Sequence, residues 1–448
     1  MNHALADLVK YQFYIISVQC VRWLRFVAIL CLIFTSLSLV LSGQSMAQSD
    51  WSEPVSEWHG RWYVASPSVL GFDPLQLSST IDSIGEMPGV YGFLLIRNGY
   101  LVAEQYWREG DVTKAHNMKS ASKSVISSLV GIAIERGHFK LDQPIIDLLP
   151  QSKLLLDVPD KKQITVRHLL TMTSGLEPTS YQSYNSWVAS SDWIEEALKA
   201  PLISVPGTTY HYSTANSHLL SAILAGNTGM STRAFAEKEL FNPMDVTISG
   251  WETDPDGIHV GGNNLSILPR DMAKFGQLYL DHGRWQERQL IPKWWVDAST
   301  AVSDNGEHET YGNYGFLWWS QPLDQGSFAA VGYGGQYVVV SPEHDTVMVV
   351  ISELESKGDL WETGLFDLLN YGVLGSLIDP SMPPKVIAAL TTTKVNLRSI
   401  PSKQGEVLRA ISAGTRVLLS KRDTQWVFGR VGQQSGWLHA QFIDQLEL

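Results

Sequence analysis

The stretch that decides the fold is SASKSVISSLVGIAIER at residues 120–136, which begins with the tetrad Ser120-Ala-Ser-Lys123. Apolar residues recur along it at close to helical spacing and Gly137 supplies a C-terminal stop, so the stretch predicts a core helix. At a helix start, the Ser120 hydroxyl and the Lys123 amine lie one turn apart on the same face. This arrangement suits a serine acyl-transfer enzyme in which lysine takes the proton of the nucleophile. The free N–H groups of the first turn would also favour negative charge on the attacking oxygen.

The first 47 residues have the layout of a secretory leader. A charge-free apolar run at 26–41 follows Arg22 and Arg25, and the small-x-small site Ser45-Met-Ala47 comes directly after it. We therefore expect a signal peptide over residues 1–47, cleavage after Ala47, and a periplasmic or secreted protein. The alternative is an uncleaved N-terminal membrane anchor, for which the apolar run is near the lower limit of length.

Composition excludes several classes of function. Both cysteines, Cys20 and Cys31, lie in the leader, which leaves the mature chain without disulfides or a thiol nucleophile. The net charge is −12 with no basic run, which argues against a nucleic-acid partner. The twelve histidines show no metal-ligand spacing, and we expect no carboxylate to accompany His211 and His218, which are seven residues apart. We expect neither a metal nor a cofactor.

The rest of the chain divides into two parts joined by a linker. After an N-terminal extension at 48–66, we expect one α/β (α+β) domain over residues 67–375, whose sheet is completed by distant parts of the chain. Asn98-Gly99 between two β-rich runs predicts a hairpin within it. The prolines of residues 376–391 predict the linker, and the short β-prone runs of residues 392–448 predict a small β-barrel. The further predicted elements are helices near 217–240, 269–282 and 359–375 and strands at 328–340 and 346–352.

Five motifs occur in a fixed order along the larger domain. They are Ser120-x-x-Lys123, LLTMTSG at 169–175, PGTTYHYST at 206–214, LPRDMAKFGQLYL at 268–280 and GYGGQ at 332–336. In this order they resemble the serine β-lactamase-like hydrolases, which include class C β-lactamases, D-alanyl-D-alanine carboxypeptidases, esterases and 6-aminohexanoate-dimer hydrolases. The resemblance implies a β-lactamase/transpeptidase-like fold, with an antiparallel sheet flanked by helices and an all-helical subdomain.

The resemblance also implies roles for particular residues. Ser120 is the nucleophile and Lys123 its hydrogen-bonded partner, while Tyr212 matches the tyrosine of the family's Y-x-N element. Such a tyrosine, as a tyrosinate or bonded to a lysine ammonium, shuttles the proton to the leaving group and later activates water. The third position of the element is Thr214 here, which puts in doubt the amide contact that β-lactamases make with substrate.

A second set of residues is expected to hold the substrate. Tyr333, Gly334 and Gly335 replace the Lys-Thr-Gly element of β-lactamases, which removes a cationic anchor for a substrate carboxylate. The backbone N–H groups of Ser120 and Gln336 would form the oxyanion hole.

Two tyrosines follow the TSG segment. Tyr181 and Tyr184 are expected to line the cleft, with ordinary surface aromatics as the competing interpretation. Trp294-Trp295 and Trp318-Trp319 are more typical of a core than of a binding platform.

The C-terminal residues 392–448 resemble bacterial SH3 domains. The match is carried by VNLR at 395–398, PS at 401–402, GTRV at 414–417, WV at 426–427 and GWL at 436–438. In that family the module often binds cell-wall peptides, so peptidoglycan is a candidate partner. A packing or spacer role is the alternative.

Together these observations predict an exported serine hydrolase that works through an acyl-enzyme on a small ester, amide or peptide substrate. Missing the carboxylate-binding lysine, it is expected to prefer esters and small linear amides to β-lactams. The alternatives are a D-alanyl-D-alanine carboxypeptidase or β-lactamase, and a penicillin-binding or cell-wall sensor with little turnover.

Overall fold

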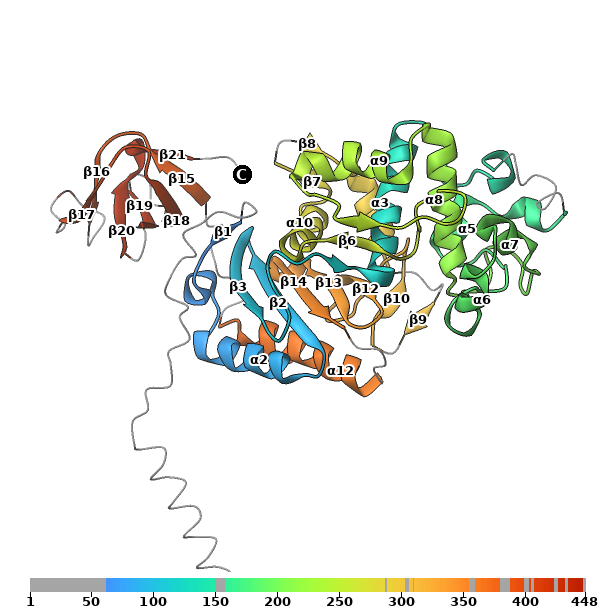
Figure 1. The fold of residues 1–448 in the computed structure, drawn as a ribbon. Coiled ribbons are helices and arrows are strands. Elements are labelled where there is room, and N and C mark those ends of the chain that lie inside the picture. Colours follow the sequence, from blue (N-terminus) through green and yellow to red (C-terminus); the bar gives the residue numbers. More distant parts are fainter. Residues whose placement is uncertain are drawn as a thin grey trace, which may run out of the picture. The chain divides into compact units, whose positions relative to one another are not determined.

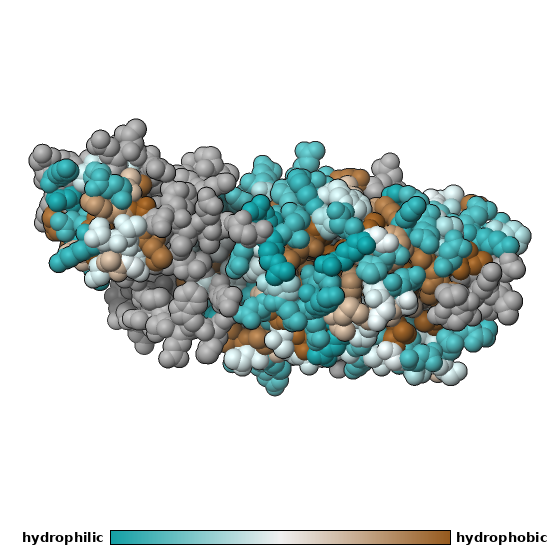
Figure 2. Space-filling model, turned by 90° about the horizontal axis from the view of Figure 1, so that it is seen from above, coloured by the Kyte–Doolittle hydropathy of each residue, from teal (hydrophilic) through white to brown (hydrophobic). Residues whose placement is uncertain are grey.

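The computed structural model describes residues 62–149, 158–286, 288–302, 306–308, 310–353, 359–378, 387–398, 403, 407–422, 426–431 and 434–445. The expected signal peptide and most of the expected extension at 48–66 lie outside these residues. Within them, no helix combines the length and the apolar character that crossing a membrane requires. On the face seen in Figure 2, hydrophilic residues prevail and hydrophobic ones lie in small separate groups.

A nine-stranded sheet forms the centre of the larger domain (Figure 1). Its strands are antiparallel to their neighbours except at the edge, where β1 runs parallel to β3. In spatial order they are β1 (Tyr63–Val64), β3 (Tyr100–Tyr106), β2 (Val90–Arg97), β14 (Thr346–Ser352), β13 (Gln336–Ser341), β12 (Phe328–Gly332), β11 (Trp319–Ser320), β10 (Gly312–Tyr314) and β9 (Glu307–His308). The N-terminal hairpin thus pairs with strands from some 250 residues later, as the separated β-rich segments predicted.

The hairpin between β2 and β3 forms where the Asn-Gly signal placed it. Arg97 faces Tyr100 across the turn, and both Asn98 and Gly99 adopt positive φ, at 50° and 74°. Two consecutive left-handed residues are what a tight hairpin turn requires, and asparagine and glycine are the residues that adopt them most readily. This local prediction is confirmed.

Helices cover both faces of the sheet. Helix α10 (Pro269–Leu280) packs on β13 and β14, and Gly276 allows the close approach, because a Cβ there would lie 2.4 Å from Val347 and 2.8 Å from Val338. The opposite face is covered by α2 (Pro74–Glu86) and α12 (Asp359–Asp367) (Figure 1). Residues of β13 alternate between the two faces, and the Tyr337 ring contacts Phe366 of α12 at 5.3 Å.

A helical region lies beside the sheet and surrounds α3 (Ser122–Glu135) (Figure 1). Its other helices are α5 (Val166–Leu170), α6 (Tyr184–Val188), α7 (Trp193–Lys199), α8 (Thr214–Thr228) and α9 (Thr232–Ala236). Residues 122–133 of α3 are all buried. The helix ends at Glu135, and Gly137 follows two residues later with a φ of 78°, the C-terminal stop that the sequence predicted. The remaining elements are α11 (Lys293–Thr300), the small sheet of β4 (His116–Asn117), β6 (Leu265–Ile267) and β5 (Gly250–Trp251), and the hairpin of β7 (Arg284–Trp285) and β8 (Arg288–Gln289).

The C-terminal residues form a separate seven-stranded antiparallel sheet around a small core that includes Leu397, Val427 and Leu438. Its strands, in spatial order, are β17 (Val407–Ile411), β16 (Val395–Arg398), β20 (Gln434–His439), β19 (Trp426–Val431), β18 (Arg416–Arg422), β15 (Ile387–Thr391) and β21 (Ile443–Gln445).

Two boundaries differ from the expected ones. Strand β15 falls in the segment expected to be linker, because its backbone pairs with β18 and β21 and only tertiary pairing reveals it as a strand. The larger domain likewise takes in β1, ahead of residue 67, through pairing with β3.

Candidate active site

Ser120 lies in a turn just ahead of α3. The turn is a single 3₁₀ turn at Lys119–Ala121, so the α-helix begins at Ser122, two residues later than the sequence pattern indicates. Lys119 has a φ of 51°, an unfavourable conformation for a residue with a side chain. Asn117 supports this conformation because its Oδ1 accepts the Lys119 N–H at 2.8 Å. The backbone therefore turns sharply immediately before Ser120.

Lys123 is 1% exposed and makes three short polar contacts. Its Nζ lies 3.1 Å from Ser120 Oγ, 2.9 Å from the Gly262 carbonyl oxygen and 3.4 Å from Thr214 Oγ1. Burial lowers the pKa of Lys123 from 10.5 to about 7, because the charged form loses its hydration. A neutral amine carries two hydrogens, so donation to Gly262 and Thr214 leaves its lone pair facing the Ser120 hydroxyl.

Thr214, at the position where the family has asparagine, uses its side chain internally. Its hydroxyl lies 2.9 Å from Ser180 Oγ, and Ser180 Oγ in turn accepts the Thr214 N–H at 2.8 Å. Both side chains are buried. The threonine thus belongs to a hydrogen-bonded chain that ends on Lys123, rather than presenting an amide to a substrate.

Tyr212 completes the catalytic trio expected from the sequence. Its ring faces Lys123 Nζ at 5.0 Å from the centroid, and its hydroxyl is hydrogen-bonded to the Ser120 side chain. Burial raises the pKa of Tyr212 above its usual value, although the bond with Ser120 works in the opposite direction. The ring is stacked on Trp319 and meets Tyr314 edge-on, at 6.4 and 5.9 Å. This environment keeps Tyr212 a neutral phenol rather than a tyrosinate.

The expected oxyanion region lies in the turn between β12 and β13. Tyr333, Gly334 and Gly335 form this turn, and both glycines have positive φ, at 81° and 91°. Gln336 begins β13 opposite Gly332, and a Cβ on Gly332 would lie only 2.2 Å from the carbonyl oxygen of Met118. The end of the hairpin therefore lies directly against the residues that precede Ser120. The Gln336 side chain turns inward and donates to the Ser352 carbonyl.

Of the expected cleft residues, Tyr181 and Tyr184 have different surroundings. Tyr181 is 82% exposed, with its ring 6.1 Å from that of Tyr212, which places it at the mouth of the site. Tyr184 packs on Trp187, and its hydroxyl accepts from Asn263 Nδ2 at 3.2 Å. Tyr181 thus contacts the ring of Tyr212, whereas Tyr184 is held by Trp187 and Asn263.

The residues of the pairs Trp294-Trp295 and Trp318-Trp319 differ in their surroundings. Trp295 and Trp318 are fully buried, and Trp294 is 43% exposed. Trp319 packs on Tyr212 and so forms part of the wall behind the site.

Sequence reasoning missed the segment at residues 254–262. Gly262 supplies the carbonyl that holds Lys123, and a Cβ there would lie 3.0 Å from Lys123 Nζ and 2.5 Å from Ser217 Oγ. The consecutive pair Gly261-Gly262 is the signal that such a close approach leaves in a sequence. The structure also corrects the view of His218 as lacking a carboxylate, because Asp254, 36 residues away, lies 2.9 Å from its Nε2.

Comparison with known proteins identifies the family of the chain. Residues 77–363 match the family model described as Beta-lactamase. The chain belongs to the beta-lactamase family. It is 23% identical over 285 residues to the 6-aminohexanoate-dimer hydrolase of Paenarthrobacter ureafaciens, a match that covers 58% of this chain and 71% of that protein.

Solved structures show the same fold. A candidate 6-aminohexanoate-dimer hydrolase from Bacillus anthracis superposes with a TM-score of 0.56 at 20% identity, covering 69% of this chain and 88% of that one. EstCE1, a hydrolase with promiscuous acyltransferase activity, superposes with a TM-score of 0.53 at 17% identity, covering 66% and 98%. The predicted β-lactamase-like α/β fold and the assignment as a β-lactamase-like serine hydrolase are both confirmed. Among the residues that the structure describes, no cluster of three or more His, Cys, Asp or Glu could hold a metal ion.

Proposed function

We propose that this chain is an exported serine hydrolase that cleaves esters or small linear amides through an acyl-enzyme on Ser120. The observation that carries the proposal is the 3.1 Å contact between Ser120 Oγ and the buried Nζ of Lys123. A lysine with a pKa of about 7 is neutral in half of the molecules at neutral pH, so it can accept a proton. A lysine amine that is shielded from solvent beside a serine hydroxyl is the arrangement expected for activation of the serine as a nucleophile.

In acylation, Ser120 Oγ attacks the carbonyl carbon as its proton passes to Lys123 Nζ. The carbonyl π bond opens and its electron pair becomes the oxyanion, to which the backbone N–H groups of Ser120 and Gln336 would donate. Collapse of this intermediate breaks the bond to the leaving alcohol or amine. The proton returns to the leaving group through Tyr212, whose phenol donates and is reprotonated from Lys123.

In deacylation, a water molecule replaces the leaving group. Its proton passes through Tyr212 to Lys123 as its oxygen attacks the acyl carbon. The bond between that carbon and Ser120 Oγ then breaks, Lys123 returns the proton to Ser120 Oγ, and the acid is released. Burial keeps the Tyr212 hydroxyl protonated at rest. Tyr212 therefore relays protons: it gives up its own proton only as it accepts another.

The hairpin turn supports a preference for substrates without a carboxylate at this end. Tyr333, which is 56% exposed, stands where β-lactamases carry lysine. Loss of such a charged hydrogen bond weakens carboxylate binding by about 1.5–3 kcal/mol. Penicillins and D-alanine termini carry that carboxylate, whereas simple esters and linear amides do not need it.

Replacement of Ser120 by alanine tests the proposal. Ser120→Ala should abolish turnover of p-nitrophenyl esters and labelling by fluorophosphonates, while the wild type shows both. Wild-type protein that hydrolyses no acyl substrate and takes no covalent label would refute it. An intact-mass spectrum after incubation with a β-lactam separates this function from a sensor, because a long-lived adduct is what a sensor would retain.

The proposal of export rests on the leader, and that of a wall-directed role rests on the SH3-like resemblance of the C-terminal sheet. Truncation at residue 384 should leave ester hydrolysis near wild type and reduce retention on purified peptidoglycan. Loss of most activity in a folded truncated protein would mean that the module completes the active site. Mass spectrometry of the protein from the host periplasm tests cleavage after Ala47.

A further inference from the structure

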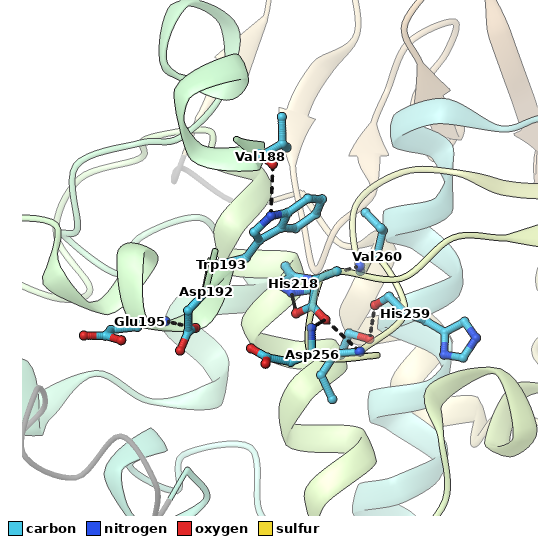
Figure 3. Close-up of polar contacts among 12 residues, drawn as sticks. Val188, Asp192, Trp193, Glu195, His218, Asp256, His259 and Val260 are labelled. Atoms are coloured by element: carbon cyan, nitrogen blue, oxygen red, sulfur yellow. Dashed lines mark hydrogen bonds and ion pairs between the residues drawn. The ribbon is translucent and has the colours of Figure 1, made fainter. Parts of the chain in front are cut away.

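A buried histidine–aspartate pair joins the second turn of α8, which carries His218, to the loop after β5, which carries Asp254. Both side chains, His218 and Asp254, are fully shielded from solvent, and they are joined at 2.9 Å through Nε2 and Oδ2. The rings of Trp187 and Trp193 pack against the imidazole at 5.7 and 5.3 Å. Figure 3 shows His218 between Trp193 and the turn that carries Asp256, His259 and Val260.

The hydrogen bonds around the ring fix its tautomer. His218 Nδ1 accepts the N–H of Gly261 at 3.4 Å, so the proton lies on Nε2 and is donated to Asp254. Burial raises the pKa of Asp254, but hydrogen bonds donated by His218, Ile258 and Asp256 outweigh it and leave this pKa below its usual value. The pair is therefore an imidazole that donates from Nε2 to the Asp254 carboxylate.

This pair joins the two ends of one loop, residues 254–261. At its start, Asp254 Oδ1 accepts the N–H groups of Asp256 and Ile258 at 3.0 and 2.8 Å. At its end, Gly261 is held to the ring, and a Cβ on Gly261 would lie 2.0 Å from the Ser217 carbonyl oxygen. The loop is thus pressed against α8 by an imidazole that contacts both of its ends.

The next residue along the chain is Gly262, whose carbonyl accepts from Lys123 Nζ at 2.9 Å. We propose that the His218–Asp254 pair is a positioning device that holds the Gly262 carbonyl against Lys123 and so orients the amine toward Ser120. Neither residue touches the reacting atoms. This inference rests on the proposed function, since it assigns the pair to the base of that same site.

Release of the loop has a defined consequence for Lys123. The groups that face its Nζ are Ser120, Thr214, the Gly262 carbonyl and the Tyr212 ring, and burial is the cause of its lowered pKa. If Gly262 withdraws, water reaches the amine and its pKa rises toward 10.5. A rise of about one pH unit lowers the neutral fraction at pH 7 about fivefold. Activity should then be lost at neutral pH and recovered in alkali.

Three variants of the full chain test the pair, with a fourth as a matched control. His218→Leu removes both bonds of the ring, and Asp254→Asn keeps an oxygen for the backbone caps but presents an NH₂ group to Nε2. The ring must then move its proton to Nδ1, which can no longer accept from Gly261. His218→Gln retains one donor and one acceptor and should act as the conservative rescue.

The control is Tyr279→Phe, which removes the buried hydrogen bond of 2.9 Å between Tyr279 and Ser128, two residues that are not among the groups facing Lys123 Nζ. For each protein we would measure kcat and KM for p-nitrophenyl acetate, the pH profile of kcat/KM, the rate of fluorophosphonate labelling and the melting temperature.

We expect His218→Leu and Asp254→Asn to lose about fivefold in kcat at pH 7, to change KM little, and to shift the acidic limb of the kcat/KM profile about one unit to higher pH. His218→Gln should keep a limb near that of the wild type, and Tyr279→Phe should lower only the melting temperature. A folded Asp254→Asn protein whose acidic limb in kcat/KM lies at the wild-type pH would overturn the inference. If His218→Leu does not fold, Asp254→Asn alone serves as the test. A wild type that takes no label would refute the proposed function instead.

Discussion

Replacing Lys123 with methionine should inactivate the protein and at the same time stabilise it. The structure buries an amine whose usual pKa is 10.5 and lowers that pKa to about 7. This gap corresponds to roughly 5 kcal/mol of free energy by which folding disfavours the charged form. Methionine has a similar length, fills the same space and carries no charge to desolvate.

The difference in unfolding free energy between Lys123→Met and the wild type depends on pH, and the direction of that dependence follows from the pKa of Lys123. Below pH 7 the lysine is charged in both states, so the folded wild type bears the whole penalty. Between pH 7 and 10.5 the unfolded chain binds more protons than the folded one, so wild-type stability rises with pH. The advantage of Lys123→Met should therefore shrink by about 3 kcal/mol between pH 7 and pH 9.5.

Urea unfolding followed by tryptophan fluorescence, at several pH values for both proteins, measures this difference. Because the two chains share every other titrating group, those contributions cancel in the comparison. Stability curves that run parallel across this range would show that the amine is not desolvated, and the reasoning about the base would be refuted.

Three further predictions follow from the geometry of the site. Gly262→Ala places a Cβ 3.0 Å from Lys123 Nζ, so it should lower kcat/KM about tenfold or more at a cost of about 1–3 kcal/mol in stability; wild-type kinetics in this variant would show that the carbonyl contact is dispensable. Tyr212→Phe removes the proton route to the leaving group and should lower kcat by about 10²–10⁴ with a small change in KM, and a variant that loses KM alone would assign Tyr212 to binding. Tyr333→Lys restores a cation at the hairpin turn and should raise nitrocefin hydrolysis relative to ester hydrolysis, so an unchanged ratio would place the preference elsewhere.

The parts of the fold that the sequence predicted well depend on neighbouring residues. Asn98-Gly99 specifies its hairpin through backbone preferences alone, and the apolar spacing of residues 122–135 with Gly137 specifies α3. The short strands β1 and β15 could not be predicted, because two or five residues become a strand only when a distant strand pairs with them.

In the candidate site, too, contacts between residues close in sequence could be predicted and contacts between distant residues could not. Ser120 and Lys123 are three residues apart and could be identified as a pair from their spacing, with the contact itself at 3.1 Å. Gly262 is 139 residues from Lys123, and no local pattern joins its carbonyl to that amine. His218 and Asp254 pair across 36 residues, so sequence spacing could not show that a carboxylate lies beside the histidine.

The central claim is that neutral Lys123 activates Ser120, and the pH dependence of fluorophosphonate labelling tests it most directly. The labelled peptide should contain Ser120, and the labelling rate of the wild type should rise with an apparent pKa near 7, the pKa to which burial lowers Lys123. In Lys123→Met the rate should be low and lack this limb. Labelling of another residue, or a wild-type rate that stays flat through neutral pH, would contradict the claim.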